Sequence, residues 1–240
     1  MNSKIIVSNN VEELSEHFAH MLIQGIDAAI DKFNIALSGG STPKAIFDYL
    51  AMNYQTKIDW NKIRFFWGDE RCVPPDHPDS NYLMTFEHLF DKIKIPEQNI
   101  FRVDGDNKPE AEVQRYSGVI KKNIPSADNI PSFDLVMLGL GEDGHTASIF
   151  PDSIELINDK SICAVSQHPA LCQKRITLTG TVINNAKKVI FLVTGEKKSE
   201  MVKNILNKNE GFEKLPASHI NPSEGELIWL LDKEAARLLN

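Results

Sequence analysis

Two residues that could move a proton stand close together in the stretch FDLVMLGLGEDGHTASIFP. Asp143 and His145 follow an apolar run with the character of a buried strand, and the neighbouring glycines favour a tight turn. A carboxylate beside an imidazole can fix the tautomer of the ring and stabilise its protonated form, as a general base near neutral pH requires. The pair is therefore a candidate for acid–base catalysis. The alternative is that Asp143 only caps the turn and His145 is an ordinary surface residue.

The same stretch contains GLGEDG, which matches the dinucleotide-binding pattern G-x-G-x-x-G. That fingerprint needs a helix that begins in the glycine loop and an acidic residue about 20 positions later. Here Glu142 and Asp143 would face the pyrophosphate with like charge, and Pro151 would cut a helix short. The segment ICAVSQ, at the expected distance, offers no acid. We interpret the match as accidental.

A second loop, LSGGSTP (residues 37–43), connects an apolar segment to a helical pattern. Free backbone N–H groups and the positive end of a helix dipole make such a loop suitable for binding an anion. It does not fit the Walker A pattern, so a nucleoside triphosphate is not implied. The candidate anion-binding residues are Gly39, Gly40, Ser41 and Thr42, and the alternative is plain helix capping.

A third loop, WGDERCVPPDHPDSNY (residues 67–82), carries Asp69, Glu70 and Arg71 directly after an apolar run. The planar guanidinium of Arg71 suits a phosphate or a carboxylate. The charged residues together could also form no more than a salt-bridged rim. Arg71 is the residue of this loop that we favour for a role in the site.

Two basic pairs follow further along the chain: Lys174 with Arg175 before ITLTG, and Lys197 with Lys198 in TGEKKSEMV. Lysines at the start of a helix oppose the helix dipole, so an anionic ligand would explain at least one of them. We expect one of the two lysines to be only a solvated surface charge.

The elements that must position these loops alternate between helical and strand patterns. Apolar residues recur at three-to-four spacing over residues 11–33, with Asn9 or Asn10 as the N-cap, and predict a long amphipathic helix. Thr42 at the N-cap and Pro43 at the first helical position predict the next helix. Strands are predicted at 33–38, 63–68, 134–140, 175–179, 188–195 and 226–232, and further helices at 80–93, 110–124, 197–207 and 233–239.

Apolar strands that alternate with helices predict an α/β fold with three layers, α/β/α, around a mostly parallel central sheet. Ligands of such sheets bind beyond the carboxyl ends of the strands, which is where the informative loops fall. No internal repeat or convincing linker interrupts the pattern. We therefore expect residues 1–240 to form a single domain.

Composition narrows the class of protein. The 240 residues are 42% hydrophobic and 25% charged, as in ordinary globular proteins, and a formal net charge of −7 disfavours nucleic acid or an anionic membrane as a partner. No segment has the pattern of a signal peptide or a membrane span. Cys72, Cys163 and Cys172 lack the spacing of a disulfide framework or a zinc site, so we expect reduced thiols and a cytoplasmic location. The sequence leaves the oligomeric state open.

Seven segments together resemble the 6-phosphogluconolactonase family, within the glucosamine-6-phosphate isomerase-like fold group. They are LSGGSTP, WGDERCVPPDHPDSNY, GLGEDGHTASIFP, RITLT, TGEKKSEM, LPASHINP and WLLDKEAA. The resemblance runs from about Ala36 to Asp232, and the order of the segments makes it specific. It departs at Gly180, where family members often have proline or leucine, and in the turn after SIFP, which reads DS.

The resemblance implies a single α/β/α domain, no required cofactor, no metal, and a site formed by these loops. It implies that His145 activates water and that Asp143 supports it, with Arg71 as a third catalytic candidate. Arg71, Arg175 and Lys198 match family positions near the phosphate or the acyl end of the substrate. The candidates for binding the substrate and its phosphate are Gly39, Gly40, Ser41, Thr42, Asp69, Arg175 and Lys198.

The implied activity is hydrolysis of 6-phospho-D-glucono-1,5-lactone to 6-phospho-D-gluconate, the second step of the oxidative pentose phosphate pathway. The expected partner is therefore a small sugar-phosphate lactone. One alternative is glucosamine-6-phosphate deaminase, whose family typically has DGHIAFNEP in this loop, with a glutamate where this chain has Phe150. Another is a non-catalytic sugar-phosphate sensor, which should carry an additional helix-turn-helix. A covalent hydrolase is disfavoured because G-x-S-x-G does not occur and Ser148 follows His145 too closely for a triad.

Overall fold

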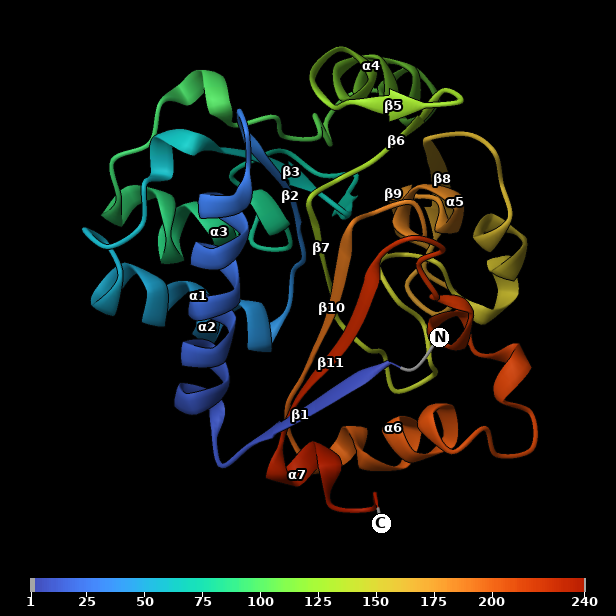
Figure 1. Ribbon diagram of the computed structural model, residues 1–240. Coiled ribbons are helices and arrows are strands. Elements are labelled where there is room, and N and C mark those ends of the chain that lie inside the picture. Colours follow the sequence, from blue (N-terminus) through green and yellow to red (C-terminus); the bar gives the residue numbers. More distant parts are fainter. Residues whose placement is uncertain (1–2, 240) are drawn as a thin grey trace.

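A six-stranded parallel sheet forms the centre of the molecule (Figure 1). The computed structural model describes residues 3–239. From one edge to the other, the strands are β1 (Lys4–Ser8), β11 (Glu226–Asp232), β10 (Lys188–Val193), β7 (Leu135–Leu138), β2 (Phe33–Leu37) and β3 (Ile63–Trp67). Strands β2 and β7 are buried along their whole length, as expected of a parallel sheet that is covered on both faces.

Helices cover both faces of this sheet, which confirms the predicted α/β/α arrangement (Figure 1). On one side lie α1 (Val11–Ala28), α2 (Ser41–Asn53) and α3 (Asn81–His88). On the other side lie α5 (Gly180–Ile183) and the strands β8 (Cys163–Gln167) and β9 (Lys174–Leu178). The remaining helices are α4 (Pro109–Asn123), α6 (Ser199–Leu206) and α7 (Lys233–Ala236). No helix within residues 3–239 is long and apolar enough to cross a membrane.

A second, antiparallel sheet has the strand order β4-β9-β8, with β4 at Asp69–Arg71. The segment RITLT is a strand as predicted, but it belongs to this second sheet and not to the central one. Its apolar pattern predicts a strand without identifying the partner strand. Strand β4 was not predicted because its three residues are all charged. A short hairpin is formed by β5 (Ser126–Ala127) and β6 (Ile130–Pro131).

The first helix begins where the sequence predicts and ends earlier. The side chain of Asn10 accepts a hydrogen bond from the backbone N–H of Glu13, so Asn10 is the N-cap. The helix ends at Ala28 and not at Phe33, because Phe33 enters β2. The Phe33 ring then packs against Gly25, where a β-carbon would overlap it.

Helix α2 starts at Ser41, so the prediction of Thr42 as its N-cap is wrong. Gly40 is the N-cap, with φ at +107°, a backbone conformation that glycine adopts without a steric penalty. The hydroxyl of Thr42 lies 2.7 Å from the hydroxyl of Thr194, at the end of β10. This contact joins the turn after β2 to the turn after β10.

Three other predicted helices are shorter than expected. Helix α3 ends at His88, since Leu89 has non-helical dihedral angles, and a 3₁₀ turn follows at Phe90–Lys92. A 3₁₀ turn at Glu196–Lys198 precedes α6, and α7 ends at Ala236. Helix α4 lies within a residue of its predicted bounds.

The carboxyl ends of the parallel strands meet at one edge of the central sheet. The turns after β2, β3, β7 and β10 therefore leave the sheet on the same side. In sheets of this kind ligands bind outside the carboxyl ends of the strands. The fold thus brings together the loops that the sequence marks as chemically informative.

Candidate active site

A pocket of about 220 Å³ opens at the carboxyl ends of the central strands. The predicted site residues that line it are Gly39, Gly40, Ser41, Thr42, Asp69, Arg71, His145, Arg175 and Lys198. Asp143 is the one predicted site residue outside the lining, and its carboxylate contacts Nδ1 of His145. Segments that are more than 150 residues apart in sequence therefore share one cavity.

Asp143 holds the imidazole of His145 through Nδ1. The distance from Nδ1 to the Asp143 Oδ1 is 2.6 Å, and the same oxygen accepts the backbone N–H of His145 at 3.1 Å. Burial alone would raise the pKa of Asp143, but the hydrogen bonds and charge of His145 outweigh it and lower that pKa to about 2. An ionised carboxylate can only accept, so Nδ1 carries the proton and Nε2 of a neutral ring is the free base.

The turn that carries this pair depends on glycine. A β-carbon on Gly141 would overlap the imidazole of His145 and the carboxylate of Asp143. Gly144 has φ at +81°, and its carbonyl accepts the backbone N–H of Ala217 at 3.0 Å. No helix begins in this turn, so a dinucleotide has no helix N-terminus to bind here. Gly141 makes room for the Asp143–His145 contact, and Gly144 makes room for the side chain of Leu215.

Strand pairing places Arg71 directly opposite Arg175, on β4 and β9. The side chain of Arg175 is only 9% exposed, and its contacts are long: 3.5 Å to the Ser148 hydroxyl and 3.5 Å to the Gln173 amide oxygen. Burial lowers the pKa of Arg175. Within residues 3–239, Nε of Arg71 and Nε of Arg175 have no hydrogen-bond partner. Two neighbouring guanidinium groups with spare donors favour an anionic ligand.

Glu70 is not part of a surface salt-bridged rim, because it is only 2% exposed. Its carboxylate accepts the backbone N–H groups of Arg71, Asn81 and Tyr82 at 2.7–2.8 Å and the hydroxyl of Ser80 at 3.1 Å. Burial raises the pKa of Glu70 against the opposing effect of these hydrogen bonds. Glu70 thereby ties β4, which carries Arg71, to the first turn of α3.

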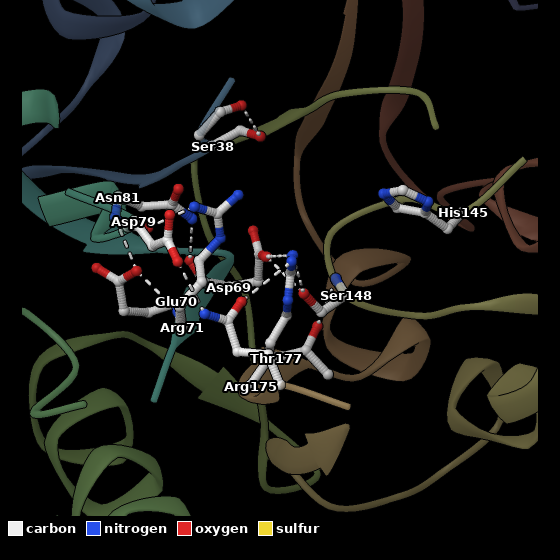
Figure 2. Close-up of polar contacts among 12 residues, drawn as sticks. Ser38, Asp69, Glu70, Arg71, Asp79, Asn81, His145, Ser148, Arg175 and Thr177 are labelled. Carbon is white, nitrogen blue, oxygen red and sulfur yellow. Dashed lines mark hydrogen bonds and ion pairs between the residues drawn. The ribbon is translucent and has the colours of Figure 1, made fainter. Parts of the chain in front are cut away.

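Asp69 faces the pocket and lies beside Arg175 and Ser148 (Figure 2). Its Oδ2 accepts the hydroxyl of Ser148 at 2.6 Å and lies 3.9 Å from Nη1 of Arg175. Its backbone carbonyl accepts the side-chain amide of Asn81 at 2.9 Å. His145 stands apart from this cluster in Figure 2, on the turn after β7.

The glycine loop after β2 and the basic turn after β10 close the pocket. Asn81 packs against Gly39, where a β-carbon would overlap its side-chain oxygen. Lys198 is half-buried in the lining, whereas Lys197 is exposed and does not line the pocket. The prediction that one of these two lysines is a surface charge therefore holds for Lys197.

Ten of the lining residues were not among the predicted site residues, and Ser38, Asn81, Ala147 and Thr194 are four of them. Ser38 and Thr194 follow strands and carry no sequence signal of their own. Asn81 stands in the segment DSNY, where its position after the capping residue Ser80 could have indicated it. Ala147 has φ at +48°, a conformation that the sequence does not reveal for alanine.

Comparison with known proteins identifies the family. The model for "Glucosamine-6-phosphate isomerases/6-phosphogluconolactonase" matches residues 9–229. The chain belongs to this family. Among its relatives, a 6-phosphogluconolactonase of Treponema pallidum is 44% identical over 171 residues, which are 71% of each protein. A 6-phosphogluconolactonase of Haemophilus influenzae is 42% identical over 207 residues, which are 86% of this chain and 87% of that protein.

Solved structures show the same fold. The 6-phosphogluconolactonase of Leishmania guyanensis superimposes with a TM-score of 0.88 at 28% identity, and the alignment covers 100% of both chains. A monomeric glucosamine-6-phosphate deaminase superimposes with a TM-score of 0.82 at 25% identity and covers 98% of this chain and 99% of that one. Both activities considered from the sequence thus occur on this fold in family members, and the residues of the site must distinguish them.

One position at which this chain differs from the deaminase pattern lies beside the imidazole. Phe150 is 1% exposed, and its ring centroid is 4.7 Å from that of His145. An apolar ring therefore occupies the place where the deaminase pattern has a glutamate. Among the described residues, no group of three or more His, Cys, Asp and Glu side chains could hold a metal ion.

Proposed function

We propose that this protein hydrolyses 6-phospho-D-glucono-1,5-lactone to 6-phospho-D-gluconate, the second step of the oxidative pentose phosphate pathway. The observation that carries the proposal is the Asp143–His145 contact of 2.6 Å beside a pocket that two arginines share. The pair supplies a base, and the arginines supply recognition of an anionic substrate. The relatives named 6-phosphogluconolactonase support the choice of substrate.

In the proposed mechanism, Nε2 of His145 removes a proton from a water molecule that attacks the lactone carbonyl carbon. The imidazolium, stabilised by Asp143, then protonates the ring oxygen as the C–O bond breaks. Arg71 stabilises the negative charge that develops on the carbonyl oxygen, an effect worth about 3 kcal/mol per preorganised donor. The reaction needs no acyl-enzyme.

Substrate binding is assigned to the rest of the pocket. The phosphate and hydroxyl groups of the substrate bind the side chains of Arg175, Lys198 and Asp69. They also bind the loop Gly39–Thr42, which leads into α2. Binding energy from the phosphate, remote from the reacting carbon, holds the lactone in register for attack. We propose that neither a metal nor another cofactor takes part.

Two broader proposals accompany this function. We propose that residues 1–240 form one domain with no nucleic-acid partner. We also propose the cytoplasm as the location, because Cys72, Cys163 and Cys172 are free thiols, as expected in a reducing compartment.

The rival functions are tested by two assays run in parallel. One follows proton release from freshly generated 6-phosphogluconolactone, corrected for spontaneous hydrolysis, and the other follows ammonia release from glucosamine 6-phosphate. We expect acceleration of the first only, because Phe150 leaves His145 without the second carboxylate that the deaminase pattern provides. Ammonia release without lactone hydrolysis would favour the deaminase. Inactivity in both assays would favour the sensor.

A further inference from the structure

Ser148 takes no part in the proposed mechanism, yet it is completely buried beside Asp69 and Arg175. Its hydroxyl donates to Oδ2 of Asp69 at 2.6 Å and lies 3.5 Å from Nη1 of Arg175. Its backbone N–H lies 3.2 Å from the hydroxyl of Thr177 on β9. The serine therefore sits where an aspartate and an arginine of opposite charge approach each other (Figure 2).

The distances show that Asp69 and Arg175 do not form a close ion pair. Nη1 of Arg175 is 3.9 Å from Oδ2 of Asp69, although both side chains are less than 10% exposed. A buried carboxylate and a buried guanidinium normally approach to about 2.8 Å, because each otherwise lacks a partner. Here the neutral hydroxyl of Ser148 provides the short hydrogen bond to this oxygen of Asp69.

As a consequence, the guanidinium of Arg175 is buried and its hydrogen bonds are weak. Its contacts to Ser148 and Gln173 are both 3.5 Å long, and its Nε has no partner in the described part of the chain. The guanidinium lines the pocket next to Arg71. Unpaired N–H donors on a buried cation lower the stability of the protein unless a ligand accepts their hydrogen bonds.

We propose that Ser148 is a positioning residue that keeps Arg175 available to an anionic substrate by occupying Asp69. Without the serine hydroxyl, Asp69 would turn to the nearest donor, and the gap to Arg175 would close to a direct ion pair. That pair would compete with the substrate for the guanidinium. The inference rests on the proposed function for the identity of the anion.

The test is a double-mutant cycle of Ser148→Ala and Asp69→Asn in the full-length protein. In S148A we expect KM for 6-phosphogluconolactone to rise about tenfold, the order expected when one charge-assisted hydrogen bond to the substrate is lost. We expect kcat to stay within about threefold, because the Asp143–His145 pair is untouched. In the D69N background, position 69 carries no negative charge that could form an ion pair with Arg175. There, S148A should change KM by less than about twofold.

A serine with a purely structural role would behave differently. It would raise KM equally in both backgrounds, and that result, or an unchanged KM in S148A, would overturn the proposal. Ser132→Ala is the matched control, since Ser132 also donates a hydrogen bond, of 2.8 Å to the carbonyl of Asn185, and does not line the pocket. If S148A does not fold, Ser148→Cys carries the same test, because a thiol of similar shape is a weak donor.

Binding measured without turnover separates this proposal from the proposed function. Titration with 6-phospho-D-gluconate and with inorganic phosphate reports the anion site even in a protein that hydrolyses nothing. An inactive wild-type protein would contradict the lactonase activity, whereas weaker anion binding by S148A would still support the role of Ser148. Equal binding by S148A and the wild type would overturn that role whatever the activity.

Discussion

In the proposed mechanism, Asp143 and His145 divide the work of a general base between them. The carboxylate, whose pKa is lowered to about 2, stays ionised at any pH at which the protein would work. It holds Nδ1 protonated and leaves Nε2 of the neutral ring as the basic atom. The ring of Phe150 lies beside the same imidazole, with the centroids 4.7 Å apart and the two planes tilted by 49°. We therefore propose that the basicity of Nε2 depends on Asp143 as a hydrogen-bond acceptor.

Replacing Asp143 by Asn tests this dependence. An amide can present N–H to Nδ1 and favour the wrong tautomer, so we expect kcat to fall about 10²- to 10⁴-fold with KM little changed. Steady-state kinetics on the lactone measure both constants. Asp152→Asn, an exposed aspartate outside the pocket lining, is the control and should keep the wild-type kcat. A D143N protein with wild-type kcat would remove Asp143 from the mechanism.

The same carboxylate predicts how stability depends on pH. The pKa of Asp143 in the folded protein is about 2, below the value of roughly 3.9 for an aspartate in an unfolded chain. Its stabilising contribution is therefore fully present above about pH 4 and is lost as the pH falls towards 2. The difference in Tm between the wild type and D143N should shrink as the pH falls from about 4 towards 2. A difference that grows as the pH falls from about 4 towards 2 would contradict the sign.

Between the strands and helices, the site depends on turns that only certain residues allow. The turn after β7 brings Asp143 against His145 because Gly141 has no β-carbon. The turn after β3 leads into a three-residue strand, β4, which is fastened to α3 through Glu70. Apolar patterns predicted most strands and helices of this frame, and the glycines indicated the turns. The pairing of β4 with β9 was not predicted, because charged residues carry no strand pattern.

Gly141→Ala should disrupt the Asp143–His145 contact, since the new methyl group would overlap both side chains. We expect kcat/KM to fall about 100-fold, the size of effect that follows a misplacement of about 1 Å. The control is Gly118→Ala on the exposed face of α4, where a β-carbon meets no atom within 4 Å. That change should keep activity and raise the unfolding free energy by about 0.5–1 kcal/mol. Equal kinetics in the two variants would show that the turn is not constrained as described.

Glu70→Ala should loosen the start of α3. It leaves three backbone N–H groups and one hydroxyl without their acceptor, so we expect a loss of about 3 kcal/mol or more in unfolding free energy. For a chain of this length the loss corresponds to a decrease in Tm of roughly 6–12 °C. Calorimetry measures it, with the exposed Glu87→Ala on the same helix as the control. A shift no larger than that of the control would mean that the Glu70 carboxylate does not anchor the helix.

For the whole molecule, the main result of folding is to concentrate cations in an acidic protein. The chain carries a formal net charge of −7, yet Arg71, Arg175 and Lys198 meet in one pocket from segments far apart in sequence. The α/β class could be predicted from the sequence, and so could most of the lining residues that stand in a distinctive sequence motif. The burial of Glu70 and the place of Ser148 between charges could not, because they depend on the antiparallel sheet. Which of Lys197 and Lys198 lines the pocket could not either, because that depends on the turn after β10.

We propose that this pocket uses His145 to hydrolyse a sugar-phosphate lactone. The most direct test is the rate of proton release from 6-phosphogluconolactone with the wild type and with His145→Ala, together with the Kd of each protein for 6-phospho-D-gluconate. We expect the wild type to accelerate hydrolysis and the variant to lose about 10²- to 10⁴-fold in kcat while keeping its affinity for the product. A variant as active as the wild type, or a wild type that does not accelerate hydrolysis, would contradict the claim.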